Sequence, residues 1–171
     1  MKFVLINGAS CSGKSTVVKK ILEEKERYYK LSYDALKWSF SRYKSDDHFD
    51  DVRRLLRAVA ETVCEMGYHI VCDSALHKET RDKLFAIAKK HGYEIIEINL
   101  EADWKVLVRR FNKRVADAEA NPERKVANKS EARFKELFDI YEAEKNPQAI
   151  VFHTDKQTID EVVDEVLKLV A

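Results

Sequence analysis

One octapeptide near the start of the chain constrains the possible fold more than any other feature. Residues 8–15 read Gly-Ala-Ser-Cys-Ser-Gly-Lys-Ser, which is the pattern G-x-x-x-x-G-K-[ST]. It lies between a short apolar run at residues 3–6 and a helical pattern that begins at Lys14, which is the strand, loop and helix context that such a loop requires. The pattern predicts a phosphate-binding loop, in which backbone N–H groups and a helix N-terminus converge on one anion.

This loop predicts a site for ATP and Mg²⁺. In loops of this type the lysine reaches the β- and γ-phosphates and the following hydroxyl binds the metal, which assigns these roles to Lys14 and Ser15. The expected nucleotide-binding residues are the loop and the residue after it: Gly8, Ala9, Ser10, Cys11, Ser12, Gly13, Lys14, Ser15 and Thr16. Within this set we interpret Cys11 as a small side chain that fills a variable position.

The composition is that of one ordinary globular domain. Of the 171 residues 45% are hydrophobic and 36% are charged, and 31 basic against 30 acidic side chains give a net charge of +1. A chain of this length can bury a core of its own, so we expect a single domain over residues 1–171. The charge balance provides no broad positive field, so any nucleic-acid binding must come from a local patch.

The cysteines and the hydropathy pattern predict a cytoplasmic protein. Cys11, Cys64 and Cys72 show neither metal-ligand spacing nor a disulfide framework, which is typical of free thiols in a reducing compartment. No apolar stretch approaches the roughly 18 residues that a membrane-spanning helix needs. We therefore expect no membrane partner, and nothing in the sequence indicates an obligate protein partner.

Short apolar runs alternate with amphipathic ones along the chain. Strands are expected at residues 2–7, 28–32, 68–73, 93–100 and 149–153. Between them apolar residues recur at helical spacing, as over residues 134–141, and Thr158 with Glu161 has the pattern of a capping box. The alternation predicts a three-layer α/β P-loop fold, with a five-stranded parallel sheet and helices on both faces.

One polar segment at residues 115–130 breaks the helical pattern. It contains Asn121-Pro122 and several cations, and it falls where this fold places a mobile covering segment, so we expect a small helical lid there. Its cations Arg124, Lys125 and Lys129 are weaker candidates for phosphate contacts than for surface charge. The lid would close over the carboxyl ends of the strands, where ligands bind in this architecture.

Two aspartates follow expected strands and are candidates for the chemistry. Asp34 comes after the second strand, and a kinase needs such a carboxylate to position or deprotonate the acceptor hydroxyl. The alternative role of Asp34 is N-cap of a helix over residues 35–41. Asp73 ends the third strand and is a candidate for the Mg²⁺ shell or for contact with the acceptor, the alternative being a turn or cap.

Cations and aromatic residues complete the candidate set. Arg110 and Arg114 are spaced i, i+4, so one helix face would direct both towards the lid and the transferring phosphoryl group; the alternative is a solvated basic face. Trp38 and Phe40 have two possible roles: they form an apolar wall against a base or a sugar, or they pack in the core. The five histidines show no mutual spacing, and we interpret all of them as structural or surface residues: His48, His69, His77, His91 and His153.

These pieces together resemble the kinase domain of phage-type polynucleotide 5′-hydroxyl kinases. The segments that carry the resemblance fall in matching order over about residues 1–145: Gly8 to Ser15, Ser32-Tyr33-Asp34 with Lys37, Val71 to Ser74, His77 to Arg81 and Val108 to Arg114. The wider group is that of small P-loop kinases related to adenylate kinase. The segment His153-Thr154-Asp155 instead looks like the ending of small-metabolite kinases, where this loop runs near the adenine.

The resemblance implies roles for individual residues. Lys14 and Ser15 look like the pair that binds ATP and Mg²⁺, and Asp34 looks like the general base. Arg110 and Arg114 look like the lid arginines, and Asp73 like the acid after the third strand. Lys37 stands where the family tends to have an arginine that holds the acceptor's phosphate, and lysine keeps the charge without the bidentate fork.

Three functions follow as hypotheses. The first is ATP-dependent phosphorylation of a polynucleotide 5′-hydroxyl, which the order of the motifs favours. The second is a small-molecule kinase with a nucleoside, nucleotide, sugar or antibiotic as acceptor, which the near-neutral charge and short chain favour. The third is a regulatory ATPase, in which water is the only phosphoryl acceptor; the candidate base and arginines argue against it.

Overall fold

The computed structural model describes residues 1–74, 77–121 and 129–171. Its five strands form one parallel sheet in the order β2-β3-β1-β4-β5, so the strand that leads into the glycine-rich loop lies at the centre. The strands are β1 Lys2–Gly8, β2 Tyr28–Leu31, β3 His69–Cys72, β4 Glu94–Glu101 and β5 Ile150–His153. Each expected strand is therefore present, within one residue of its expected bounds, and the expected fold class is confirmed.

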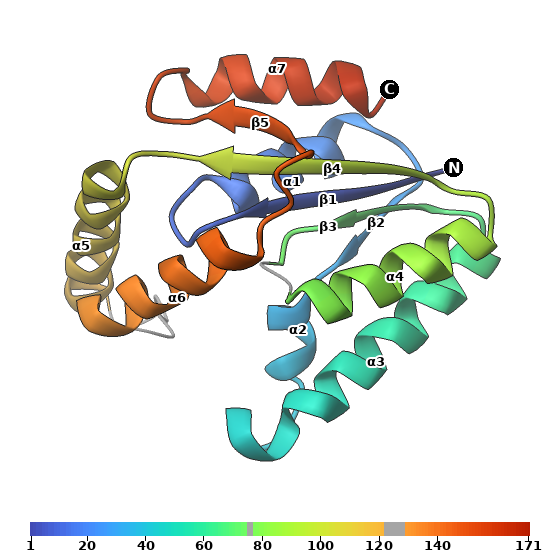
Figure 1. Cartoon of the computed structure of the whole chain (residues 1–171), viewed down its shortest axis with the longest axis horizontal. Coiled ribbons are helices and arrows are strands. Elements are labelled where there is room, and N and C mark those ends of the chain that lie inside the picture. Colours follow the sequence, from blue (N-terminus) through green and yellow to red (C-terminus); the bar gives the residue numbers. More distant parts are fainter. Residues whose placement is uncertain (75–76, 122–128) are drawn as a thin grey trace.

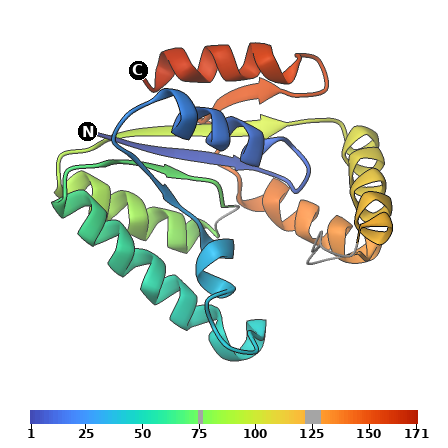
Figure 2. The same cartoon turned by 180° about the vertical axis from the view of Figure 1, so that it is seen from behind.

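Helices cover both faces of the sheet and one of its ends (Figures 1 and 2). Their bounds are α1 Lys14–Glu24, α2 Tyr33–Lys37, α3 Ser45–Glu65, α4 Lys78–Lys90, α5 Trp104–Ala120, α6 Glu131–Glu144 and α7 Ile159–Leu169. The α1 and α7 helices lie on one face and α3 and α4 on the other, while α5 and α6 extend beyond the carboxyl ends of the strands. In the described part of the chain, no helix combines the length and apolar character that crossing a bilayer requires.

The alternation of side chains along β1 explains the two main cores. Val4 and Ile6 face α1 and α7, whereas Phe3 and Leu5 face α3 and α4, and all four are fully buried. A third apolar cluster forms beyond the strand ends, where Phe134 of α6 stacks on Phe111 of α5 with ring centroids 4.4 Å apart. This third cluster holds the two projecting helices against the glycine-rich loop through Ala9.

Two helix starts test the local expectations. The capping box at α7 is confirmed, because the Thr158 hydroxyl and the Glu161 carboxylate each bond the other's backbone N–H. The alternative role of Asp34, as the N-cap of a helix over residues 35–41, is wrong. Ser32 caps α2, its hydroxyl accepting a hydrogen bond from the N–H of Ala35 at 3.4 Å, because the chain turns into the helix as soon as β2 ends. Asp34 therefore lies in the first turn of α2, where its carboxylate does not cap the helix.

The segment expected to form the lid begins as part of a long helix. Residues 115–120 continue α5 without interruption, and α6 begins at Glu131 behind the Ser130 N-cap, whose hydroxyl accepts from the N–H of Arg133 at 3.3 Å. Most of the remaining segment, including Arg124 and Lys125, lies outside the described residues. Lys129 is exposed just before the cap.

A buried ion pair joins α4 to the sheet. The Arg81 guanidinium lies 3.4 Å from a Glu97 carboxylate oxygen, both side chains are less than a tenth exposed, and the Asn146 amide donates to Glu97 at 2.7 Å.

We expect Arg81→Ala to lower the free energy of unfolding by roughly 3–5 kcal/mol, because Glu97 would stay buried without its counter-charge. Urea unfolding measures this loss. The exposed Arg54→Ala control should change stability by less than about 0.5 kcal/mol, and equal effects would contradict the assignment.

Candidate active site

The glycine-rich loop adopts a backbone that its glycines make possible. Gly8 has φ +151° and Gly13 has φ +103°, both in the region that side chains disfavour. A Cβ at Gly8 would lie 2.5 Å from the Ser12 hydroxyl oxygen and 2.6 Å from the Leu100 carbonyl oxygen. Cys11 also has a positive φ, of +66°, so the chain turns sharply at three points within six residues. The loop therefore curls around a small space ahead of α1.

That space suits a phosphate group. The Lys14 ammonium lies inside the curl and donates hydrogen bonds to the carbonyl oxygens of Gly8 and Ala9 at 2.7 and 2.8 Å. The N–H groups of Cys11 and Gly13 donate to no other described residue, and the buried Ser12 hydroxyl likewise has no partner among them. These unpaired donors and the lysine fit an anion at the N-terminus of α1. Ser15 and Thr16 are exposed in the first turn of that helix.

The enclosed position of Lys14 gives the site a pH dependence. Burial lowers the pKa of Lys14 to about 8, although the nearby Asp73 carboxylate opposes that fall. Because only the charged amine attracts phosphate strongly, we expect ATP affinity to decrease as the pH rises through about 8, by up to about tenfold per pH unit. Calorimetric titration with ATP from about pH 7 to about pH 10 measures this slope. An affinity that stays constant over this range would contradict it.

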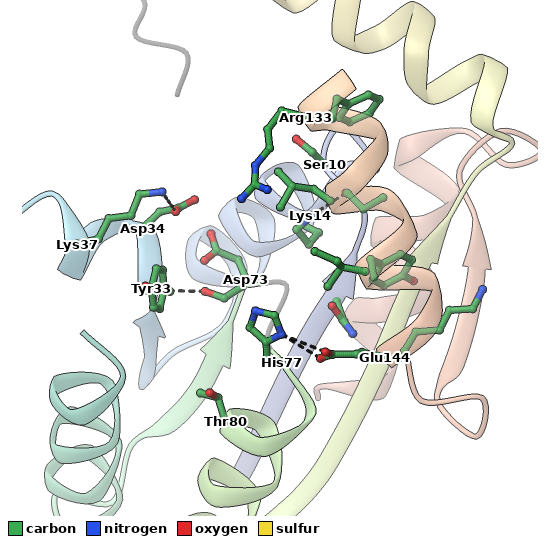
Figure 3. Close-up of a pocket in the computed structure, with 18 of the residues that line it drawn as sticks. Ser10, Lys14, Tyr33, Asp34, Lys37, Asp73, His77, Thr80, Arg133 and Glu144 are labelled. Atoms are coloured by element: carbon green, nitrogen blue, oxygen red, sulfur yellow. Dashed lines mark hydrogen bonds and ion pairs between the residues drawn. The ribbon is translucent and has the colours of Figure 1, made fainter. Parts of the chain in front are cut away.

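A cavity of about 400 Å³ opens in front of the loop. Figure 3 shows side chains from several elements directed into it. The lining includes residues of β1 and the loop, of the segment after β3, and of α2 to α6: Asn7, Ala9, Ser10, Lys14, Tyr33, Asp34, Lys37, Phe49, Arg53, Asp73, Ser74, His77, Thr80, Phe111, Arg114, Arg133, Phe134, Leu137, Ile140, Tyr141, Glu144 and Lys145. The cavity is therefore continuous from the phosphate loop to α6.

Asp34 and Lys37 form one wall of the cavity. The carboxylate of Asp34 lies 2.5 Å from the Lys37 ammonium one helical turn away, and Asp34 is 74% exposed whereas Lys37 is 16% exposed. The structure thus brings both sequence-predicted residues to the cavity, with the base candidate already paired to a cation. Trp38 is 62% exposed, so the core role considered for it is wrong; neither it nor Phe40 lines the cavity.

Asp73 lies at the end of β3, beside the loop. Its side chain is 10% exposed and its carboxylate is 2.8 Å from the Lys30 ammonium. Of the charged groups around Lys14, Asp73 has the largest effect on the pKa of that lysine, which it raises. Among the described residues no three His, Cys, Asp or Glu side chains cluster closely enough to hold a metal. Mg²⁺ at nucleotide sites needs only one or two protein oxygens beside phosphates and waters, so Ser15 and Asp73 suit it chemically.

The two candidate arginines of α5, Arg110 and Arg114, have different surroundings. Arg114 lines the cavity and lowers the pKa of Lys14, and it forms no ion pair with a described carboxylate. Arg110 donates to the Cys11 carbonyl oxygen at 3.4 Å and to the Thr154 hydroxyl at 3.0 Å, and also bonds the Thr154 carbonyl. Arg110 therefore links the glycine-rich loop to the segment between β5 and α7, whereas Arg114 faces the cavity.

Sequence reasoning missed several cavity residues. Arg53, Arg133, Glu144 and His77 line it from α3, α6 and the start of α4. The interpretation of His77 as merely structural or surface does not describe its place, because its ring lies in the cavity wall (Figure 3). Arg53, Arg133 and Glu144 belong to no short motif, and only the packing of distant helices brings them to the cavity. The apolar stripe over residues 134–141, now part of α6, also supplies the cavity wall through its buried members Phe134 and Tyr141.

A central parallel strand, a glycine-rich loop before α1 and carboxylates at two neighbouring strand ends define a P-loop domain of the kinase type. Within this class the chain belongs to an AAA-domain family, whose model matches residues 3–137. No curated protein sequence gives a significant match.

Solved structures share the fold at low identity. A candidate kinase from Chloroflexus aurantiacus has a TM-score of 0.73 and 18% identity over 99% of this chain and 96% of that one. The APS kinase CysC of Mycobacterium tuberculosis, in complex with AMPPNP and APS, has a TM-score of 0.63 and 23% identity over 99% and 96% of the two chains. A sugar kinase from Janibacter has a TM-score of 0.64 and 17% identity over 99% and 94%.

Proposed function

We propose that this protein is a kinase that transfers the γ-phosphoryl group of ATP to a hydroxyl group of an acceptor. The observation that carries the proposal is the single cavity in which Lys14, Asp34 and Asp73 meet three arginines, one each from α3, α5 and α6. A nucleotide loop alone would serve a regulatory ATPase equally well. Carboxylates and cations on the far side of the cavity are what phosphoryl transfer to a second substrate requires.

The proposed chemistry divides among the residues by position. Lys14 and Arg114 offset the charge of the transferring phosphoryl group. Asp34 accepts the proton of the acceptor hydroxyl while the hydroxyl oxygen bonds to the γ-phosphorus. The bond from that phosphorus to the β,γ-bridging oxygen breaks, and ADP is released. Arg110 holds the loop backbone through the Cys11 carbonyl. Mg²⁺ bound at Ser15 and Asp73 would supply further charge neutralisation.

A small acceptor suits the cavity best. Its volume of about 400 Å³ lies at the lower end of the range of small-molecule sites. Aromatic rings from α3, α5 and α6 and several cations form its walls, and a net charge of +1 provides no extended basic surface. The solved structures of an APS kinase and a sugar kinase have the same fold, which supports this choice. Lys37 would then hold an anionic or polar group of the acceptor beside Asp34.

One observation favours a polynucleotide 5′-hydroxyl as the alternative acceptor. Trp38 is 62% exposed just outside the cavity, and the Lys37 ammonium lies 4.9 Å from its ring centroid. An exposed aromatic face beside a cation is the combination on which nucleobases stack. A nucleic-acid end could therefore lie on Trp38 with its terminal hydroxyl directed to Asp34.

A direct screen separates these acceptors. The wild-type protein is incubated with ATP labelled at the γ-phosphate and with sugars, nucleosides, nucleotides, aminoglycosides or a 5′-hydroxyl oligonucleotide. Labelling of a small compound supports the first choice. Labelling of the oligonucleotide that Trp38→Ala weakens by about fivefold or more supports the alternative. Release of phosphate to water alone, whatever is added, would remove the kinase proposal and leave a regulatory ATPase.

A further inference from the structure

A histidine and a glutamate form a hydrogen-bonded pair in the cavity wall opposite α2. The Nδ1 atom of His77 lies 3.1 and 3.2 Å from the two carboxylate oxygens of Glu144. Glu144 also accepts a hydrogen bond from the N–H of Lys78 at 2.9 Å. Figure 3 shows the His77 ring and the Glu144 carboxylate side by side, joined by dashed lines. The end of α6 is thus joined to the start of α4 at the cavity itself.

The chemistry of the pair fixes which nitrogen faces the acceptor. The hydrogen bond from His77 lowers the pKa of Glu144, so the carboxylate is ionised near neutral pH and can only accept hydrogen bonds. The proton of neutral His77 therefore resides on Nδ1, and Nε2 carries a lone pair. The His77 ring packs against Phe49 in a T-shaped arrangement, with the ring centroids 5.8 Å apart and the ring planes at 82°. The backbone carbonyl of Glu144 accepts a hydrogen bond from the Arg81 guanidinium at 3.1 Å. Both partners are thereby held in place.

We propose that the Nε2 atom of His77 accepts a hydrogen bond from a second donor group of the acceptor, with Glu144 as the positioning residue. This inference rests on the proposed kinase function. It names the acceptor class as a compound with at least two hydrogen-bond-donating groups, such as a polyol or a sugar. One hydroxyl reacts at Asp34, and another binds at His77, which lies on a different wall of the same cavity.

A matched pair elsewhere in the chain provides the control. His91 lies 2.7 Å from a Glu61 carboxylate oxygen through its Nε2 atom, and neither residue lines the cavity. Two substitutions at His77 distinguish the hydrogen bond from packing. Phenylalanine keeps a flat ring without an acceptor atom, whereas glutamine retains an amide oxygen that can accept.

The experiment measures phosphoryl transfer from ATP to glucose, ribose and adenosine, each beside its monodeoxy analogues, and to 1-propanol. We expect wild-type protein to favour an acceptor with several hydroxyls over 1-propanol. His77→Phe should raise the KM for that acceptor about three- to tenfold, in line with one lost hydrogen bond. It should leave the KM unchanged for the analogue that lacks the hydroxyl bound at His77. His77→Gln should raise this KM much less than His77→Phe does, and Glu144→Gln should raise it by an intermediate amount. His91→Gln should leave it unchanged.

The outcomes separate this inference from the kinase proposal. If the wild-type protein releases phosphate only to water with these acceptors and with every compound of the screen described above, the kinase proposal is removed, and the role of His77 with it. Transfer to a compound of that screen but to none of these acceptors would overturn only the role of His77. Transfer that His77→Phe does not alter, or that it weakens equally for every deoxy analogue, would overturn only the role of His77. Two-dimensional ¹⁵N–¹H NMR of the full chain tests the tautomer without any acceptor. A proton on Nε2 of neutral His77 would overturn the inference.

Discussion

We expect the Lys14→Ala variant to lose at least about a hundredfold in kcat/KM for ATP turnover, whatever the acceptor proves to be. The ammonium is the one side-chain cation inside the curl of the loop among the described residues, where it bonds the Gly8 and Ala9 carbonyl oxygens. When a nucleotide enters, the same group can turn to its phosphates. Removing the ammonium takes away the positive charge that offsets the negative charge of the bound triphosphate and of the transferring phosphoryl group. Both ATP binding and the rate of turnover should therefore fall.

A second lysine of α1 is the matched control. Lys19 is 74% exposed and lies 3.5 Å from Glu23 on the surface of the helix. Lys19→Ala removes the same charge and length from the same helix, and we expect ATP turnover to stay within about twofold of wild type. Calorimetry with ATP and a coupled assay for ADP report on both variants. Retained turnover in Lys14→Ala would overturn the assignment of the phosphate loop.

The second large effect is expected at Asp34. Asp34→Asn should lower phosphoryl transfer to the acceptor by about a hundred- to ten-thousandfold, because the amide cannot take the proton of the attacking hydroxyl. The ATP Kd should stay near that of wild type, since the carboxylate lies on α2 and not in the loop. This split between transfer and nucleotide binding distinguishes a base from a residue that only supports the fold.

Asp82→Asn controls for the loss of an aspartate that is paired with lysine on a helix. Asp82 lies 2.6 Å from the Lys78 ammonium on α4 and is outside the cavity lining. We expect no change in transfer for this variant. If Asp34→Asn transfers phosphate at the wild-type rate, Asp34 is not the base, and Asp73, the other strand-end carboxylate of the cavity, becomes the candidate.

The glycine-rich loop and the sheet could be predicted from the sequence because their signals are local. The loop is eight consecutive residues, and each strand is a short apolar run, so spacing alone gave the sheet and the position of Lys14. Helix ends were harder to predict. The cap of α2 moved from Asp34 to Ser32 because both residue types favour that position, and only the backbone turn after β2 decides between them.

The far wall of the cavity could not be predicted, because it depends on contacts between distant segments. His77 and Glu144 are 67 residues apart, and their pairing needs α6 to end beside the start of α4. Arg110 and Arg114 share the spacing of one helix face, yet the Thr154 segment draws Arg110 away from the cavity. Single-sequence patterns record which residues share an element and do not record which elements meet.

The central position of β1 bears on how a protein of this kind can change during evolution. The glycine-rich loop is one uninterrupted stretch between β1 and α1, whereas most of the remaining cavity wall comes from α2 to α6, which are separated along the chain. Mutations that alter one part need not disturb the other. A gene duplicate could therefore acquire a new acceptor through scattered substitutions in these helices while its phosphate-binding loop stays unchanged.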